Sequence, residues 1–237
     1  MRKNNDFCLS LPQVKATFDC EIDAHRLVVL GGRAPDPFWL RSAADGRIVW
    51  AADHGAEACR IAGLTPDRAL GDFDSISKET MEWLKRLGVK TERFPADKDQ
   101  TDFQLCLRAG EAALVTGCWG GRFDHAFVNV FSALWNGPNL SVRAFADESE
   151  ILIPIAGKAA LDLEFQTLPM ALSLLPLSGI CRGVDIHGTK WELDGAELSQ
   201  SCPCAISNIA ARSRVSVRVE QGILGVYCFF KETLNNF

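Results

Sequence analysis

The sequence has no long hydrophobic run and no regular set of cysteine pairs. No stretch approaches the roughly 18 to 20 apolar residues of a membrane-spanning helix, so we expect no association with a membrane. The basic start, MRKNN, is not followed by the apolar segment of a secretion signal. The nine cysteines are scattered and odd in number, which does not indicate a disulfide framework. We therefore expect a reduced, cytoplasmic protein.

An excess of positive charge is also missing. Lys and Arg number 25 against 30 Asp and Glu, so the net charge of −5 offers no general field for attracting nucleic acid. The pattern G-x-x-x-x-G-K-[ST] does not occur, which excludes a P-loop enzyme. Local groups or a metal ion must therefore hold any anionic substrate.

The first half of the chain alternates short apolar runs with amphipathic segments. The runs are RLVVLGG (26–32), RIVWAAD (47–53), RALGDFD (68–74), EAALVTG (111–117) and SVRAFAD (141–147). Helical spacing of apolar residues is present in segments 77–88, 101–110 and 123–135. This alternation predicts an α/β fold with a doubly wound, mostly parallel sheet and helices on both faces.

After about residue 148 the pattern changes to short, partly alternating strands separated by glycines. Val215, Val217 and Val219 alternate with polar residues, and the turn EQG (220–222) predicts a hairpin with the run that follows. This pattern is typical of a smaller all-β sandwich. We therefore divide the chain into an N-terminal extension (1–25), an α/β domain (26–150) and a β-sandwich domain (151–237).

Acidic residues follow several of the predicted parallel strands. They are Asp53 after the second run, Asp72 and Asp74 after the third, and Asp97, Asp99 and Asp102 after KTERFP (90–95). The motif GGRFDH (120–125) follows another strand. Ligands of doubly wound folds bind beyond the carboxyl ends of the strands, so we expect these groups to meet at one edge.

Each motif also has a purely structural explanation. Asp53 would cap the helix after it, Asp99 and Asp102 would form a capping box, and His125 would be a packed helix residue. Together these explanations leave five or six carboxylates crowded without a counter-charge. Mg²⁺ binds through a few carboxylates and substrate phosphates, and Arg122 suits phosphate oxygens. The residues predict a magnesium-dependent enzyme that acts on a nucleotide polyphosphate.

These motifs resemble those of the thiamine pyrophosphokinase family over most of the chain. GGRAP, ADHGA, GDFDS, KDQTD and GGRFDH occur in the family's order, and SLLPLSG, GTKWEL and AISN resemble its second domain. The resemblance implies transfer of a pyrophosphoryl group from ATP, the co-substrate, to thiamine, with Mg²⁺ as the cofactor. It also implies a homodimer with active sites at the subunit interface, and a second domain that binds thiamine.

The resemblance further implies roles for particular residues. Catalysis and Mg²⁺ binding would fall to Asp72, Asp74 and Asp99, and either Asp74 or Asp99 would accept the proton of the thiamine hydroxyl. ATP would contact Asp53, Gln100, Thr101, Asp102, Arg122 and Asp124. Thiamine would contact Ser207 and Asn208 of the partner subunit.

The sequence departs from the family pattern at two positions. His54 stands where the family has the first glycine of A-D-G-G-A, which adds a side chain where backbone freedom could be needed. Gly225 stands where some members place an aromatic residue that stacks on thiamine. Trp191 is a weak candidate for that stacking role, and we expect it to be a core residue instead.

Three alternatives stay open at this point. Pterin pyrophosphokinases share the D-x-D strand end, but GTKWEL and AISN argue against them. Phosphatases of the haloacid dehalogenase type also use D-x-D, usually after the first strand, whereas Asp72 follows the third run. A nucleotide- or thiamine-sensing dimer without turnover would have no need for the full set of carboxylates.

Overall fold

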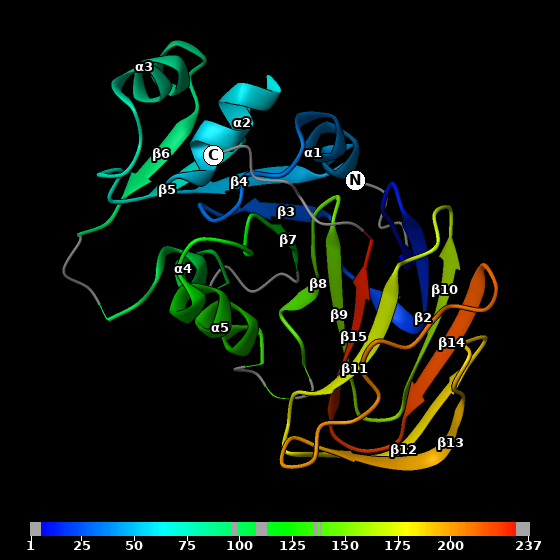
Figure 1. Cartoon of the computed structure of the whole chain (residues 1–237). Helices are drawn as coiled ribbons and strands as arrows, with labels where there is room; N and C mark the ends of the chain where they lie inside the picture. Colours follow the sequence, from blue (N-terminus) through cyan, green and yellow to red (C-terminus); the bar gives the residue numbers. More distant parts are fainter. Residues whose placement is uncertain (1–5, 96–98, 108–112, 135–136, 138, 231–237) are drawn as a thin grey trace. The chain divides into compact units, whose positions relative to one another are not determined.

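The computed structural model describes residues 6–95, 99–107, 113–134, 137 and 139–230 (Figure 1). Contacts divide the chain into two compact units. The α/β unit consists of Asp23–Trp135 and Ser141–Asp147, and the β unit consists of Met1–Ile22, Asn136–Leu140 and Glu148–Phe237. None of the helices among the described residues has the length and apolar character to cross a membrane.

The α/β unit is built on a parallel sheet. Its strands are β3 (Arg26–Val29), β4 (Ile48–Ala52), β5 (Arg68–Gly71), β6 (Lys90–Arg93), β7 (Ala113–Thr116) and β8 (Val142–Ala146). They lie in the order β8-β7-β3-β4-β5-β6, and each adjacent pair is parallel. The strand order reverses between β3 and β7, as expected where ligands bind in open α/β sheets. The predicted combination of an α/β part with a β-rich part is confirmed.

Among the described residues, five helices connect these strands. They are α1 (Pro37–Ala44), α2 (Gly55–Ala62), α3 (Lys78–Arg86), α4 (Asp102–Leu107) and α5 (Phe123–Ser132). Figure 1 shows α1 and α2 on one side of the parallel strands and α4 and α5 on the other. The last three of these helices lie within the segments whose spacing predicted helices.

The helix starts follow from local side chains. Asp36 accepts hydrogen bonds from the first-turn amides of α1, and Pro37 at the first position suits a helix start. Ser77 caps α3 by accepting a hydrogen bond from the Thr80 amide at 3.1 Å. The structural alternative in which Asp99 and Asp102 form a capping box is wrong. The reciprocal pair is Thr101 with Gln104 (3.2 and 3.0 Å), because the helix begins at Asp102 and so places Thr101 at its N-cap.

The β unit contains two groups of antiparallel strands. One is the six-stranded sheet β1-β2-β10-β14-β12-β13, and the other is the run β11-β15-β9. The bounds are β1 (Asp6–Ser10), β2 (Val14–Ile22), β9 (Glu150–Ala156), β10 (Ala159–Phe165), β11 (Ala171–Pro176), β12 (Ile180–His187), β13 (Leu193–Ser199), β14 (Arg214–Val219) and β15 (Ile223–Phe229). The segment predicted as an N-terminal extension supplies β1 and β2, and β2 pairs with β10. The three predicted domain boundaries stay a prediction.

The predicted hairpin at residues 220–222 is wrong. β14 pairs with β10 and β12, whereas β15 pairs with β9 and β11. The alternation of valines in β14 would be the same if β15 paired with β14 or if β15 joined another group of strands. The sequence pattern therefore does not distinguish a hairpin from a crossover. The amides of Glu220 and Gln221 both donate to the Arg182 carbonyl, at 3.0 and 3.1 Å, and hold the turn against β12.

Candidate active site

Three carboxylates meet at the carboxyl ends of two adjacent parallel strands. Asp53 follows β4, and Asp72 and Asp74 follow β5. Oxygen atoms of the three side chains all lie within 4.8 Å of one another. Asp99 is not in this group, although it is among the described residues, and Asp97 lies outside them. The sequence placed Asp53 among the ATP contacts, whereas the geometry groups it with the two predicted metal ligands.

Asp53 holds the loop that carries the other two carboxylates. One of its oxygens accepts a hydrogen bond from the Phe73 amide at 3.0 Å, and the other accepts one from the Ser75 hydroxyl. The alternative that Asp53 caps the next helix is wrong, because the N-cap of α2 is His54. The carboxylate instead joins the ends of β4 and β5.

The loop after β5 is compact and highly charged. The Asp72 carboxylate accepts a hydrogen bond from the Asp74 amide at 3.0 Å. Gly71 has a φ of 145°, and a β-carbon there would lie 3.0 Å from that of Asp53, so only glycine fits. The charge on Asp72 is the main cause that raises the pKa of Asp74, and the charges on Asp53 and Asp102 act in the same direction. This concentration of negative charge suits a cation.

Glu57 on α2 fixes the other end of the same loop. Its carboxylate accepts hydrogen bonds from the Ser77 amide and the Thr80 hydroxyl, both at 2.6 Å, and from Arg60 at 3.4 Å. Burial raises the pKa of Glu57, but these hydrogen bonds outweigh burial and lower it to about 2. Glu57 therefore stays ionised and ties the start of α3 to α2. Sequence reasoning missed this residue, since a single glutamate in a helix carries no distinguishing signal.

Arg122 and Asp124 form an ion pair at the start of α5. The guanidinium donates to the two carboxylate oxygens at 3.1 and 2.5 Å. The Arg122 hydrogen bond is the main cause that lowers the pKa of Asp124. Both side chains are exposed, so a phosphate could exchange with the carboxylate on Arg122.

The remaining predicted ATP contacts lie at the start of α4. Asp99 and Thr101 are exposed, and Gln100 and Asp102 are partly buried. The charge on Asp102 contributes to the raised pKa of Asp74. Asp102 therefore acts electrostatically on the group formed by Asp53, Asp72 and Asp74.

Ser207 and Asn208 lie in a loop of the β unit and differ in environment. The Asn208 side chain is buried, and its amide donates to Thr189 Oγ1 at 3.1 Å and to the Trp191 carbonyl at 2.6 Å. Its oxygen accepts from the Trp191 amide at 3.2 Å and the Ile209 amide at 2.8 Å. These contacts make Asn208 the support of the loop that carries Trp191, whereas Ser207 is exposed.

The expectation that Trp191 is a core residue is wrong. Its side chain is 53% exposed, and the Lys190 ammonium lies 4.6 Å from the ring centre. A short loop whose backbone is held by Asn208 leaves the indole with little to pack against. At Gly225 a β-carbon would lie 2.8 Å from a Leu152 methyl group, the end of a flexible side chain.

Backbone strain marks the same two regions. Among the described residues, positive φ outside glycine occurs at Asp53 (46°), Phe73 (62°), Ala205 (59°) and Ser207 (56°). Such conformations cost about 1–3 kcal/mol each and cluster at functional sites. Two of these residues lie in the carboxylate group's loops and two in the Ser207 loop. Residue type gave no signal at Phe73 and Ala205, because Phe and Ala rarely adopt this conformation.

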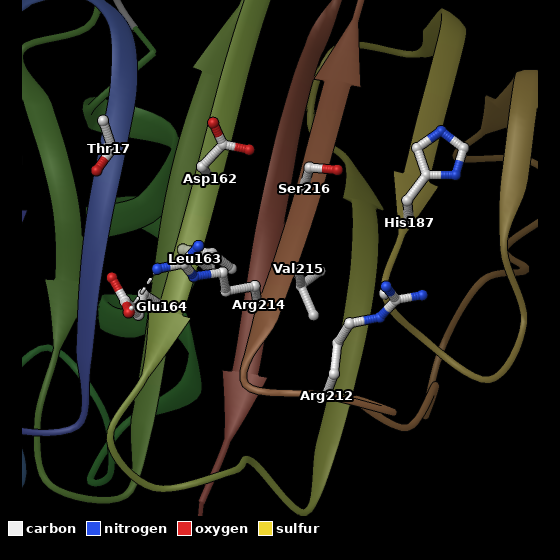
Figure 2. Close-up of a pocket in the computed structure, with 10 residues that line it drawn as sticks. Thr17, Asp162, Leu163, Glu164, His187, Arg212, Arg214, Val215 and Ser216 are labelled. Atoms are coloured by element: carbon white, nitrogen blue, oxygen red, sulfur yellow. Dashed lines mark hydrogen bonds and ion pairs between the residues drawn. The ribbon is translucent and has the colours of Figure 1, made fainter.

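A cavity of about 550 Å³ lies on the six-stranded sheet of the β unit (Figure 2). Its cationic side chains have acidic partners: Arg214 lies 3.2 Å from Glu164, and Arg212 lies 3.8 Å from Glu192. None of the predicted site residues lines it. The strained carboxylate site, not this cavity, is the candidate active site.

Family models match both parts of the chain. Residues 41–143 match "Thiamin pyrophosphokinase, catalytic domain", and residues 162–224 match "Thiamin pyrophosphokinase, vitamin B1 binding domain". The chain belongs to the thiamin pyrophosphokinase family. The carboxylate group lies within the family's catalytic-domain match, and Trp191, Ser207 and Asn208 lie within its vitamin B1-binding match.

Relatives within the family are distant in sequence. The chain is 26% identical to the thiamine pyrophosphokinase of Bacillus subtilis over 186 residues, which are 76% of this chain and 86% of that protein. It is 26% identical to thiamine pyrophosphokinase 1 of Oryza sativa over 171 residues, 67% of this chain and 64% of the rice protein.

Solved structures of the family share the fold. The crystal structure of the Bacillus subtilis thiamine pyrophosphokinase matches with a TM-score of 0.77 at 23% identity, covering 87% of this chain and 99% of that one. The Candida albicans thiamin pyrophosphokinase matches with a TM-score of 0.74 at 17% identity, covering 87% and 89%.

Proposed function

We propose that this protein is a thiamine pyrophosphokinase, which transfers a pyrophosphoryl group from ATP to the hydroxyl of thiamine and releases AMP. The observation that carries the proposal is the group of Asp53, Asp72 and Asp74 within the family's catalytic-domain match. The match to the vitamin B1-binding domain in the same chain supports thiamine as the acceptor rather than a pterin.

The donor set at the carboxylate group fits Mg²⁺. Three carboxylate side chains with oxygens within 4.8 Å offer the hard oxygen ligands that this ion takes, and substrate phosphates would complete its coordination. We propose Asp72 and Asp74 as ligands, with Asp99 as a third ligand once nucleotide is bound. The ion would neutralise charge on the phosphate oxygens during transfer.

The chemistry is an in-line displacement at phosphorus. The thiamine hydroxyl oxygen forms a bond to the β-phosphorus, the bond from that phosphorus to the α,β-bridging oxygen breaks, and AMP departs with its electrons. Either Asp74 or Asp99 accepts the hydroxyl proton. The protein's main contribution is to hold the reacting groups in line.

We assign ATP binding to residues at the edge of the parallel sheet. They are Asp53, Gln100, Thr101, Asp102, Arg122 and Asp124. The reversal of strand order between β3 and β7 supports a doubly wound sheet, whose ligands lie at such a point. The exposed guanidinium of Arg122 supports a phosphate contact.

Thiamine is held, in this proposal, by the loop that carries Ser207 and by Trp191. The thiazolium ring of thiamine is cationic, and an exposed indole suits a cationic ring. Asn208 supports this loop through the Trp191 backbone. The positive φ of Ser207 is consistent with a binding loop held in a strained conformation.

We also propose a homodimer that shares its active sites between subunits. The exposed face of α5 supports this, since Phe123, Phe127 and Phe131 are 80%, 50% and 37% exposed, with ring centres 5.9 and 4.6 Å apart along the helix. An apolar stripe of this kind marks an interaction surface. The buried free thiols of Cys59, Cys181 and Cys228 support a reducing, cytoplasmic setting.

The test is product analysis with purified protein, ATP, Mg²⁺ and thiamine. The proposal expects AMP and thiamine diphosphate in equal amounts, and AMP formation that depends on thiamine. Formation of ADP or free phosphate instead would contradict it.

A further inference from the structure

His54 stands just after β4, between the loop after β3 and the loop after β5. It is the N-cap residue of α2, with φ −58° and ψ −17°, an ordinary right-handed helical conformation. A side chain costs nothing in that conformation. The glycine that the family pattern has here is therefore not required by the backbone, and the imidazole is free to take another role.

The imidazole contacts the loop of the carboxylate group. Its Nδ1 lies 3.1 Å from the carbonyl oxygen of Ser75. A carbonyl oxygen only accepts hydrogen bonds, so Nδ1 carries the hydrogen and donates it. Asp53 accepts a hydrogen bond from the hydroxyl of the same serine. Ser75 is therefore held by its carbonyl and by its side chain, from two consecutive residues.

The β-carbon of His54 lies close to the loop after β3. A β-carbon built at Gly31 would lie only 2.7 Å from the β-carbon of His54, so glycine at position 31 makes room for the histidine. The glycine at position 31 and the side chain at position 54 are thus complementary. His54 is seated between Gly31 and Ser75.

The loop needs such support. Phe73 has a φ of 62°, which is strained for a bulky residue, and the like charges of Asp72 and Asp74 repel each other. We propose that His54 is a positioning residue that holds residues 72–76 in the conformation that brings Asp72 and Asp74 to Asp53 before any ligand binds. Only the kinetic consequence of this inference rests on the proposed function; the effect on the loop does not.

Three substitutions separate the hydrogen bond from other effects of the side chain. His54→Ala removes the donor, His54→Asn keeps an N–H near the position of Nδ1, and His54→Gln offers the same amide near the position of Nε2. His54 is exposed, so all three are expected to fold.

The first readout is amide hydrogen exchange without nucleotide or metal. The Phe73 and Ser77 amides donate to Asp53 and Glu57, so their exchange reports opening of the loop. We expect exchange about fivefold faster in His54→Ala and His54→Gln, the effect of one net hydrogen bond, and a wild-type rate in His54→Asn. Amides of β14 serve as the internal control.

The second readout is the division between KM and kcat. A loop that must be ordered on binding raises the KM for MgATP about fivefold in His54→Ala, with kcat and the KM for thiamine changed less than about twofold. Wild-type exchange in His54→Ala, or exchange in His54→Asn as fast as in His54→Ala, overturns the proposal. If the wild-type protein makes no thiamine diphosphate, the proposed function fails, and the exchange rates alone still decide the role of His54.

Discussion

At the scale of single residues, the site depends on carboxylates that repel one another until a cation is bound. We expect Asp72→Asn and Asp74→Asn each to lower turnover by about 100-fold or more, because each would remove a proposed ligand of Mg²⁺, the ion proposed to stabilise the transferred charge. The thermal midpoint should stay equal or rise, since the substitution relieves like-charge repulsion. Thermal melts and steady-state kinetics check both statements.

The matched control for these variants is Asp162→Asn, an exposed aspartate on the six-stranded sheet. It should leave turnover unchanged. Near-normal turnover in both Asp72→Asn and Asp74→Asn would remove the metal role of this loop.

Trp191 carries a second prediction at this scale. Replacement by Leu removes an exposed ring suited to the thiazolium cation, worth about 1–2 kcal/mol, so the KM for thiamine should rise roughly tenfold. The KM for ATP should not change. Trp83→Leu, a partly buried tryptophan on α3, is the control. An unchanged thiamine KM in Trp191→Leu would assign the indole no part in binding.

At the scale of elements, Glu57 joins α2 to the start of α3. Its pKa in the folded protein is about 2, against 4.5 for an ordinary glutamate, so the ionised form is favoured by folding. That contribution is fully present above about pH 4.5 and is lost as the pH falls towards 2. Glu57→Gln should therefore lower the free energy of unfolding by about 1–3 kcal/mol at pH 7, and by much less at pH 3.

Urea denaturation at the two pH values measures this difference. Glu79→Gln is the control, because Glu79 meets the same Arg60 at 2.9 Å but is 73% exposed, and surface pairs contribute little. A gap between wild type and Glu57→Gln that is equal at both pH values would contradict the assignment.

Element types were largely predictable, whereas pairing and caps were not. Periodicity was enough to place α3 and the buried valines of β14. It did not distinguish a hairpin from a crossover at residues 220–222, because both leave the same alternation. The cap of α4 falls at Thr101 rather than at Asp99, since the choice among adjacent polar residues depends on where the helix begins.

At the scale of the whole molecule, the exposed stripe on α5 predicts self-association. The protein should elute at about twice its 26.0 kDa chain mass, and Phe127→Glu should shift it to the monomer and abolish thiamine-dependent turnover. Phe38→Glu, at an isolated phenylalanine that is 71% exposed, should leave the dimer intact. A wild-type monomer at working concentrations would remove the shared-site part of the account.

The order of motifs along the chain was sufficient to predict the family and the Asp72–Asp74 pair. The third member of the group, Asp53, was predicted as a nucleotide contact, because sequence does not show that its carboxylate turns towards Phe73 and Ser75. The buried support role of Asn208 was equally hidden, since it arises from hydrogen bonds to residues 17 to 19 positions away.

The most direct test of the central claim is AMP release from ATP and Mg²⁺, with and without thiamine, followed by nucleotide chromatography. A thiamine pyrophosphokinase releases AMP only when thiamine is present, matched mole for mole by thiamine diphosphate. Tight binding of both ligands without turnover would indicate a sensor, and ADP or free phosphate would indicate a kinase or phosphatase. Either result would contradict the account.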